Sequence, residues 1–225
     1  MIQPSTLDFL RDLSQNNTRE WFQEQKPRYE TALANMVTVA DQLQDAMLEV
    51  DNIEPREAKK MLFRIYRDVR FSANKAPYKT HFSGSMQRAT DALRGGYYFH
   101  IMPGGSFQGG GFWAPEKEDL LRIRTAIADD PEPLREIISD PVFVKIFGSL
   151  QGETLKTAPK GFDKEHPAID LIRHKTFIVM RSFTDAEVCS ATFVDQLVEG
   201  YAAMLPFFDY MSEVLTTDGN GLPLV

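Results

Sequence analysis

Residues 95–113, GGYYFHIMPGGSFQGGGFW, predict a pair of antiparallel strands and with it the class of the fold. Apolar and polar residues alternate over residues 97–102 with the period of a strand, and PGG at residues 103–105 is a tight-turn sequence. The chain then returns through residues 106–113, although three successive glycines are weak strand formers. Because so short a turn joins antiparallel strands, we expect a hairpin at the centre of the fold.

The segments on either side complete a mixed pattern of helices and strands. Alternation predicts further strands at residues 61–71, 80–86 and 176–183, and helical spacing dominates the N-terminal third. Thr184 and Glu187 form a capping box that predicts a final helix running to about Met204. We therefore expect one α+β domain over residues 1–225, with a helical N-terminal third, a central antiparallel sheet of about 4–6 strands, helices packed on it and a C-terminal helix.

Composition limits the class of protein. The chain has 225 residues, of which 43% are hydrophobic and 25% are charged, as in water-soluble globular proteins. No apolar run is long enough to span a bilayer, and the N-terminus lacks the pattern of a signal peptide. The single cysteine, Cys189, excludes an intrachain disulfide and a multi-cysteine metal cluster. A cytoplasmic protein without a membrane partner is the expectation.

Charge is distributed unevenly along the chain. The net charge is −7, yet residues 56–94 contain ten basic and three acidic side chains, whereas residues 182–225 contain seven acidic and no basic ones. Such a basic segment is typical of a local anion site or of pairing with the acidic segments. The acidic remainder disfavours general nucleic-acid binding, because it repels phosphate.

The basic segment is densest at residues 64–82, RIYRDVRFSANKAPYKTHF. Guanidinium groups bind phosphate or carboxylate through two parallel hydrogen bonds, and lysine and tyrosine add a compact charge and a directional donor. On the predicted strand, Arg67 would lie on the apolar face, where an unpaired charge is costly. The candidate ligand-binding residues are Arg64, Arg67, Arg70, Lys75 and Tyr78. Asp68 and His100 are the candidates for acid–base chemistry, and Lys79 and His81 are outlying candidates.

Metal and cofactor signals are weak. The four histidines form no HxH or HExxH pair, and the glycine-rich stretch contains neither GxGxxG nor a P-loop pattern. A site made of His81, His100 and a carboxylate requires the fold to bring them together. We therefore expect no metal and no cofactor.

The spacing of the basic residues is also a family signature. From Arg64 to Tyr78 the sequence matches the pattern RxxRDxRFxxxKxPY at every specified position, and so resembles the bacterial family called domain of unknown function 2461. NNTREWF, GGYYFHIMPGG and PKGFDKEHPAIDLIRHKTFIV are also similar to that family. The resemblance implies a single-domain bacterial protein and implies no particular reaction.

The leading hypothesis is a pocket, lined by arginine, lysine and tyrosine, that binds an anionic or phosphorylated small molecule. Two alternatives stay open: a structural ion-pair network in a protein that acts through protein–protein contacts, and a nucleic-acid-associated protein. Whether the chain is an enzyme stays open as well.

Overall fold

The computed structural model describes residues 1–218 and 222–223. The chain forms two compact units, and each is described by itself. Unit 1 comprises Met1–Met86, Tyr98–Gln108 and Ser182–Glu199, and unit 2 comprises Gln87–Tyr97, Gly109–Arg181 and Gly200–Val225. The single domain expected from the sequence stays a prediction.

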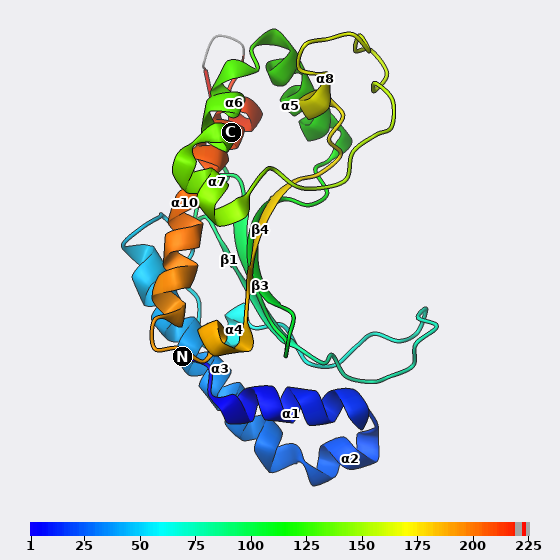
Figure 1. Cartoon of the computed structure of the whole chain (residues 1–225), viewed down its shortest axis with the longest axis vertical. Helices are drawn as coiled ribbons and strands as arrows, with labels where there is room; N and C mark the ends of the chain where they lie inside the picture. Colours follow the sequence, from blue (N-terminus) through cyan, green and yellow to red (C-terminus); the bar gives the residue numbers. More distant parts are fainter. Residues whose placement is uncertain (219–221, 224–225) are drawn as a thin grey trace. The chain divides into compact units, whose positions relative to one another are not determined.

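A four-stranded antiparallel sheet contains the predicted hairpin and confirms the α+β class (Figure 1). Its order is β1-β2-β3-β4, so every strand pairs with its neighbour in sequence. The strands are β1 (Phe82–Gln87), β2 (Gly96–Ile101), β3 (Ser106–Phe112) and β4 (Phe177–Phe183). The turn between β2 and β3 is residues 102–105, as the PGG sequence predicts.

Helices form the N-terminal region, much of the chain between β3 and β4, and the C-terminal region. Their bounds are α1 (Pro4–Gln15), α2 (Arg19–Glu24), α3 (Lys26–Leu48), α4 (Ala58–Met61), α5 (Lys117–Asp129), α6 (Glu132–Ser139), α7 (Pro141–Phe147), α8 (Ile169–Ile172), α9 (Asp185–Val188) and α10 (Phe193–Thr216). None of the helices within the described ranges is long and apolar enough to cross a membrane.

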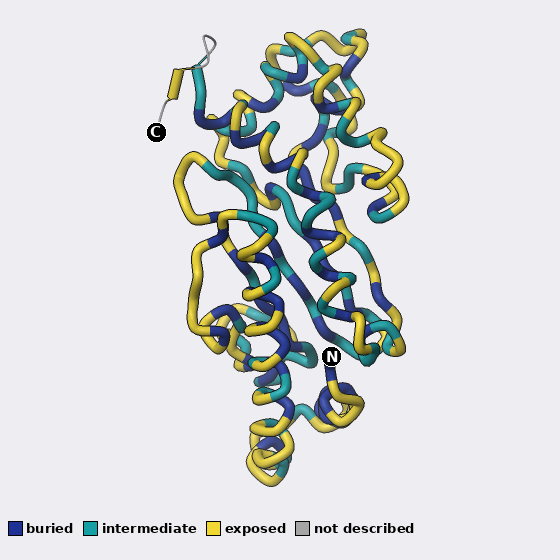
Figure 2. Tube along the Cα trace, turned by 90° about the vertical axis from the view of Figure 1, so that its left-hand side faces the viewer, coloured by how far each residue is buried: buried dark blue, intermediate teal, exposed yellow. Residues whose placement is uncertain are grey.

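Aromatic contacts hold the helices on the sheet. In unit 1, Tyr29 of α3 stacks on Phe82 of β1 with ring centroids 6.3 Å apart. In unit 2, the ring centroid of Tyr97 lies 4.9 Å from that of Tyr201 and 5.2 Å from that of Phe208, and both of these residues are on α10. Figure 2 shows buried residues along the strands and along both of these long helices. Large aromatic rings thus supply much of the buried apolar area that stabilises each unit.

The glycine run in β3 is explained by close packing in unit 2. A Cβ atom on Gly110 would lie 2.6 Å from the sulfur of Met204 and 2.8 Å from the ring of Phe208. Gly111 has φ of +123°, and a Cβ there would lie 2.2 Å from the carbonyl oxygen of Phe177. These positions therefore need glycine for space and for backbone conformation, although glycine is a poor strand former in general.

The strand predicted at residues 61–71 is wrong. Only isolated bridges form there, Leu62 with Gly84 and Tyr66 with Tyr78, and the rest of residues 62–80 is irregular. The physical reason is that side chains satisfy backbone carbonyls in this segment: Lys75 Nζ donates to Val69 O at 2.9 Å. Alternating polar and apolar residues fit such an extended, irregular segment as well as they fit a strand.

The prediction for the C-terminal helix is also corrected. The capping box of Thr184 and Glu187 is present, but it caps the short helix α9. The Ser190 hydroxyl donates to Glu187 O at 2.7 Å, and α10 begins only at Phe193. Hydroxyl groups that bond to the backbone compete with a continuing helix, which explains the break, and α10 then runs well past Met204.

Candidate functional site

Arg67 and Lys75 close the loop formed by residues 67–77 in unit 1. The Arg67 guanidinium donates to Ala76 O at 3.0 Å and to Ser72 Oγ at 3.4 Å, and its backbone N–H donates to Pro77 O at 2.9 Å. Lys75 Nζ bonds the carbonyl oxygens of Val69, at 2.9 Å, and Arg70, at 3.4 Å. Both cations therefore shape the loop by bonding its backbone.

Asp68 and Arg70 form an exposed ion pair on the same loop. Arg70 Nη2 lies 2.6 Å from Asp68 Oδ2, and the side chains are 77% and 60% exposed, respectively. The hydrogen bond from Arg70 lowers the pKa of Asp68 below its ordinary value. Exposed pairs of this kind contribute little to stability, and neither residue lines a described cavity of unit 1.

Arg64 and Phe71 extend into solvent. Arg64 is exposed and makes no hydrogen bond or ion pair with any residue that the structure describes. Phe71 is 96% exposed, with the Arg70 guanidinium 5.9 Å from its ring centroid. The structure therefore does not bring Arg64, Arg70 and Lys75 together around one cavity.

Tyr78 anchors the end of the signature to the N-terminal helices of unit 1. It is 4% exposed and stacks on Phe22 of α2, with ring centroids 3.9 Å apart and planes 13° from parallel. The Asn17 side chain accepts from Tyr78 N at 3.1 Å and donates to Tyr78 O at 2.9 Å. Burial raises the pKa of the Tyr78 phenol. These contacts fix the chain just before the next three residues, 79–81.

A cavity of about 310 Å³ lies beside this anchor, and two cations line it. Arg67 comes from the loop and Lys79 from the segment that leads into β1; Ser14, Asn17, Thr80 and His81 are among the other lining residues. The residues that line it include no aspartate or glutamate. The cavity therefore combines positive charge with hydrogen-bonding groups and lacks a carboxylate in its lining.

Lys79 has no anionic partner among the described residues. Its Nζ lies 5.6 Å from the centroid of the Phe63 ring, and this ammonium group makes no hydrogen bond or ion pair with the described part of the chain. Burial lowers the pKa of Lys79 below the ordinary value for lysine. An anion at this position would offset that cost, because it favours the charged form of the amine.

His81 and His100 stack on each other next to the cavity, with ring centroids 4.0 Å apart. His100 stacks in turn on Phe107 at 4.8 Å, and its Nδ1 lies 3.1 Å from the Tyr98 hydroxyl. Burial, followed by the charges of His100 and Lys79, lowers the pKa of His81 to about 4. Burial also lowers the pKa of His100. A neutral imidazole both donates and accepts one hydrogen bond, so His81 offers the cavity either function at neutral pH.

His100 lies where the alternation of its strand predicts, whereas Lys79 and His81, only outlying candidates in the sequence, line the cavity. His100 shares a sheet face with Tyr98, as the alternation over residues 97–102 predicts. Lys79 and His81 are two residues apart just before β1, and a period of two places both on one side of an extended chain. This spacing of two residues is the feature of the sequence that predicts Lys79 and His81 on the same side of the chain. Within the described ranges, no group of three or more metal-binding side chains accompanies the two histidines.

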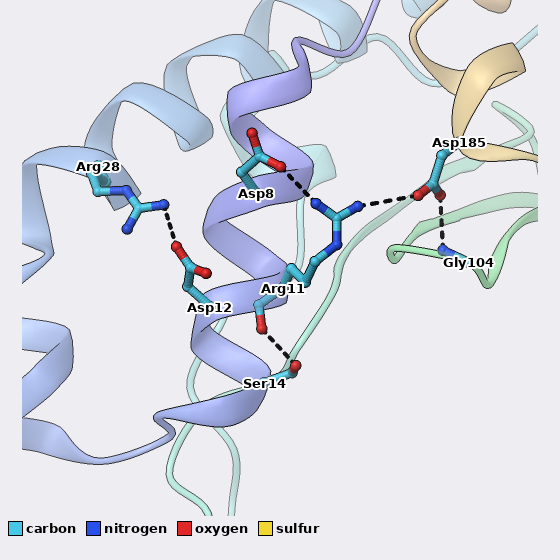
Figure 3. A network of polar contacts seen from close by, with 7 residues as sticks. All are labelled: Asp8, Arg11, Asp12, Ser14, Arg28, Gly104 and Asp185. Atoms are coloured by element: carbon cyan, nitrogen blue, oxygen red, sulfur yellow. Dashed lines mark hydrogen bonds and ion pairs between the residues drawn. The ribbon is translucent and has the colours of Figure 1, made fainter.

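A second cavity of unit 1, of about 460 Å³, adjoins the first, because Ser14 and Thr80 line both. Figure 3 shows the polar network at its edge. Arg11 of α1 bonds Asp8 at 2.6 Å and Asp185 at 3.4 Å, and Asp185 accepts from Gly104 N at 2.8 Å. The second cavity thus has a carboxylate at its edge, unlike the first.

Comparison with known proteins gives a family and no described activity. No curated protein and no solved structure matches the chain. The family model described as "Conserved hypothetical protein (DUF2461)" matches residues 5–210. Because that match covers most of the chain, the protein belongs to this family of conserved hypothetical proteins.

Proposed function

We propose that the cavity beside Arg67 and Lys79 binds an anionic small molecule through a phosphate or carboxylate group. The observation that carries this proposal is the pairing of two cations in one cavity whose lining includes no carboxylate. Positive charges that are partly removed from water need a counter-charge, and a bound anion supplies it.

Three of the lining residues, Arg67, Lys79 and Thr80, have hydrogen-bond donors available for an anion. The Arg67 guanidinium has five N–H donors, and contacts to Ala76 and Ser72 use only part of them while holding the group in place. Lys79 Nζ and the Thr80 hydroxyl make no hydrogen bond with the described residues. A guanidinium fixed by its own loop binds with little loss of side-chain freedom, which favours affinity.

The proposal narrows the set of ligand residues predicted from the sequence. Arg67 and Tyr78 line the cavity, whereas Arg64, Arg70 and Lys75 do not. Of the two acid–base candidates, His100 stacks on the lining residue His81, while Asp68 pairs with Arg70 on the exposed loop. We therefore assign anion binding to Arg67 and Lys79 and keep His81 as the group able to exchange a proton with a bound ligand.

The alternative of a structural ion-pair network has less support. The partners of Arg67 and Lys75 are backbone carbonyls and a serine hydroxyl, and the ion pair within the signature is the exposed one between Asp68 and Arg70. Binding of nucleic acid stays an alternative that the exposed Arg70 and Phe71 keep open. A titration with single-stranded oligonucleotides at low and moderate salt tests it, because such binding weakens steeply with salt.

Isothermal titration calorimetry with inorganic phosphate tests the proposal. We expect Lys79→Met to weaken phosphate binding by about 10-fold or more, since it removes a charge-assisted hydrogen bond worth roughly 1.5–3 kcal/mol. Arg64→Met is the matched control, because it removes a nearby positive charge that neither lines the cavity nor bonds the loop of residues 67–77. Equal losses in both variants would mean that general charge, and not this cavity, attracts the anion.

A further inference from the structure

The two adjoining cavities of unit 1 differ in charge. The first is lined by Arg67 and Lys79 with no carboxylate, whereas Asp185 and Arg11 line the second. Ser14 and Thr80 are common to both linings, so the two cavities are neighbours. A ligand that occupies both would meet a different electrostatic environment at each end.

The second cavity has one carboxylate in its lining, that of Asp185, which shares the Arg11 guanidinium with Asp8. The bond from Arg11 to Asp8, at 2.6 Å, is much shorter than its bond to Asp185, at 3.4 Å (Figure 3). Arg11 is therefore engaged mainly by Asp8, which does not line this cavity, and Asp185 is the carboxylate that a cation in the cavity can meet.

Asp185 retains the capacity to accept another hydrogen bond. Its side chain is 36% exposed, and its bonding partners are Gly104 N, at 2.8 Å, and Arg11 Nη2, at 3.4 Å. An ionised carboxylate offers about four acceptor positions. The second cavity is also lined by the apolar side chains of Leu10, Met102 and Pro103.

We propose that the ligand is bipolar: its anionic group binds at Arg67 and Lys79, its protonated amine binds at Asp185, and a short apolar chain joins the two. This inference rests on the proposed function and adds the class of ligand, of which an aminoalkyl phosphate is the simplest representative. Charge complementarity at both ends favours this class over a simple phosphate or a dianion.

A series of synthetic probes tests the inference by calorimetry. The probes are inorganic phosphate, alkyl phosphates and ω-aminoalkyl phosphates with chains of about two to six carbons. For at least one chain length, we expect the amino compound to bind roughly fivefold more tightly than the alkyl compound of equal length, as for a favourable solvent-accessible ion pair. Asp185→Asn should abolish that preference and leave the affinity for inorganic phosphate unchanged, because an amide oxygen can still accept from Gly104 N.

Asp12→Asn is the matched control. Asp12 lies on the same helix as Asp8 and pairs with Arg28 at 2.7 Å, but it lines neither of the two cavities (Figure 3). This variant should keep the preference for the amine. Phosphate binding without a preference for the amine at any chain length would overturn the bipolar ligand and leave the proposed function standing. Absence of phosphate binding would overturn both.

Discussion

The pH dependence of stability should reveal the buried, neutral state of His81. In the folded protein its pKa is lowered from 6.5 to about 4, first by burial and then by the charges of His100 and Lys79. The unfolded chain takes up a proton near pH 6.5, while the folded chain does so only near pH 4. Protonation therefore favours the unfolded state as the pH falls from 6.5 to 4, and stability is lost over that interval.

The magnitude follows from the two pKa values. Their difference corresponds to about 3 kcal/mol in the free energy of unfolding. Because His81 is only half-buried and water screens part of the effect, we expect a loss of about 2 kcal/mol. Burial is the largest cause of the lowered pKa, and salt screens only the contribution of neighbouring charges. Most of this loss of stability should therefore persist in about 0.5 M salt.

Urea unfolding followed by circular dichroism between pH 7.5 and pH 4.5 measures the effect. The comparison is between the wild type and His81→Asn, whose side chain does not titrate, while carboxylates and the other histidines titrate in both proteins. We expect the stability of the wild type to fall by about 2 kcal/mol more than that of the variant over this range. Parallel curves for the two proteins would refute the assignment of a buried, neutral imidazole next to the cavity.

Further substitutions test the packing within each unit. Tyr78→Ala should lower the free energy of unfolding by about 3–4 kcal/mol, because it removes a buried ring stacked on Phe22. Arg64→Ala should change it by less than about 0.5 kcal/mol, because this side chain is exposed. Chemical denaturation measures both values, and equal effects would contradict the roles assigned to Tyr78 and Arg64. Gly111→Ala should destabilise the protein by more than about 1 kcal/mol, because a Cβ at φ +123° meets the carbonyl of Phe177. A thermal melt of that variant that matches the wild type would show that β3 does not need this close approach.

Local signals in the sequence predicted most elements of the fold. The PGG turn placed the β2–β3 hairpin, and the capping box of Thr184 and Glu187 marked the start of a helix, which is α9. These features depend on residues a few positions apart. The strand expected at residues 61–71 failed because Arg67 and Lys75 bond the backbone of their own loop, and periodicity alone does not reveal such bonds.

The candidate site was located by the signature but not resolved into its parts. The family pattern pointed to residues 64–78, within the basic stretch 64–82, yet Lys79 and His81, just beyond Tyr78, line the cavity instead of Arg64 and Arg70. Which of these residues line the cavity depends on contacts between segments far apart in the sequence, such as Asn17 with Tyr78 and His81 with His100. Only the folded chain brings those residues together.

The most direct test of the anion site is a crystal of the protein soaked in tungstate, whose oxygens accept hydrogen bonds as phosphate oxygens do. We predict an anomalous difference peak from tungsten in the cavity, with oxygens of the bound tungstate about 3 Å from the Arg67 guanidinium and from Lys79 Nζ. The peak should vanish in crystals of Lys79→Met and persist in those of Arg64→Met. An empty cavity at Arg67 and Lys79, or an anion bound only at the exposed Arg64 and Arg70, would contradict the central claim.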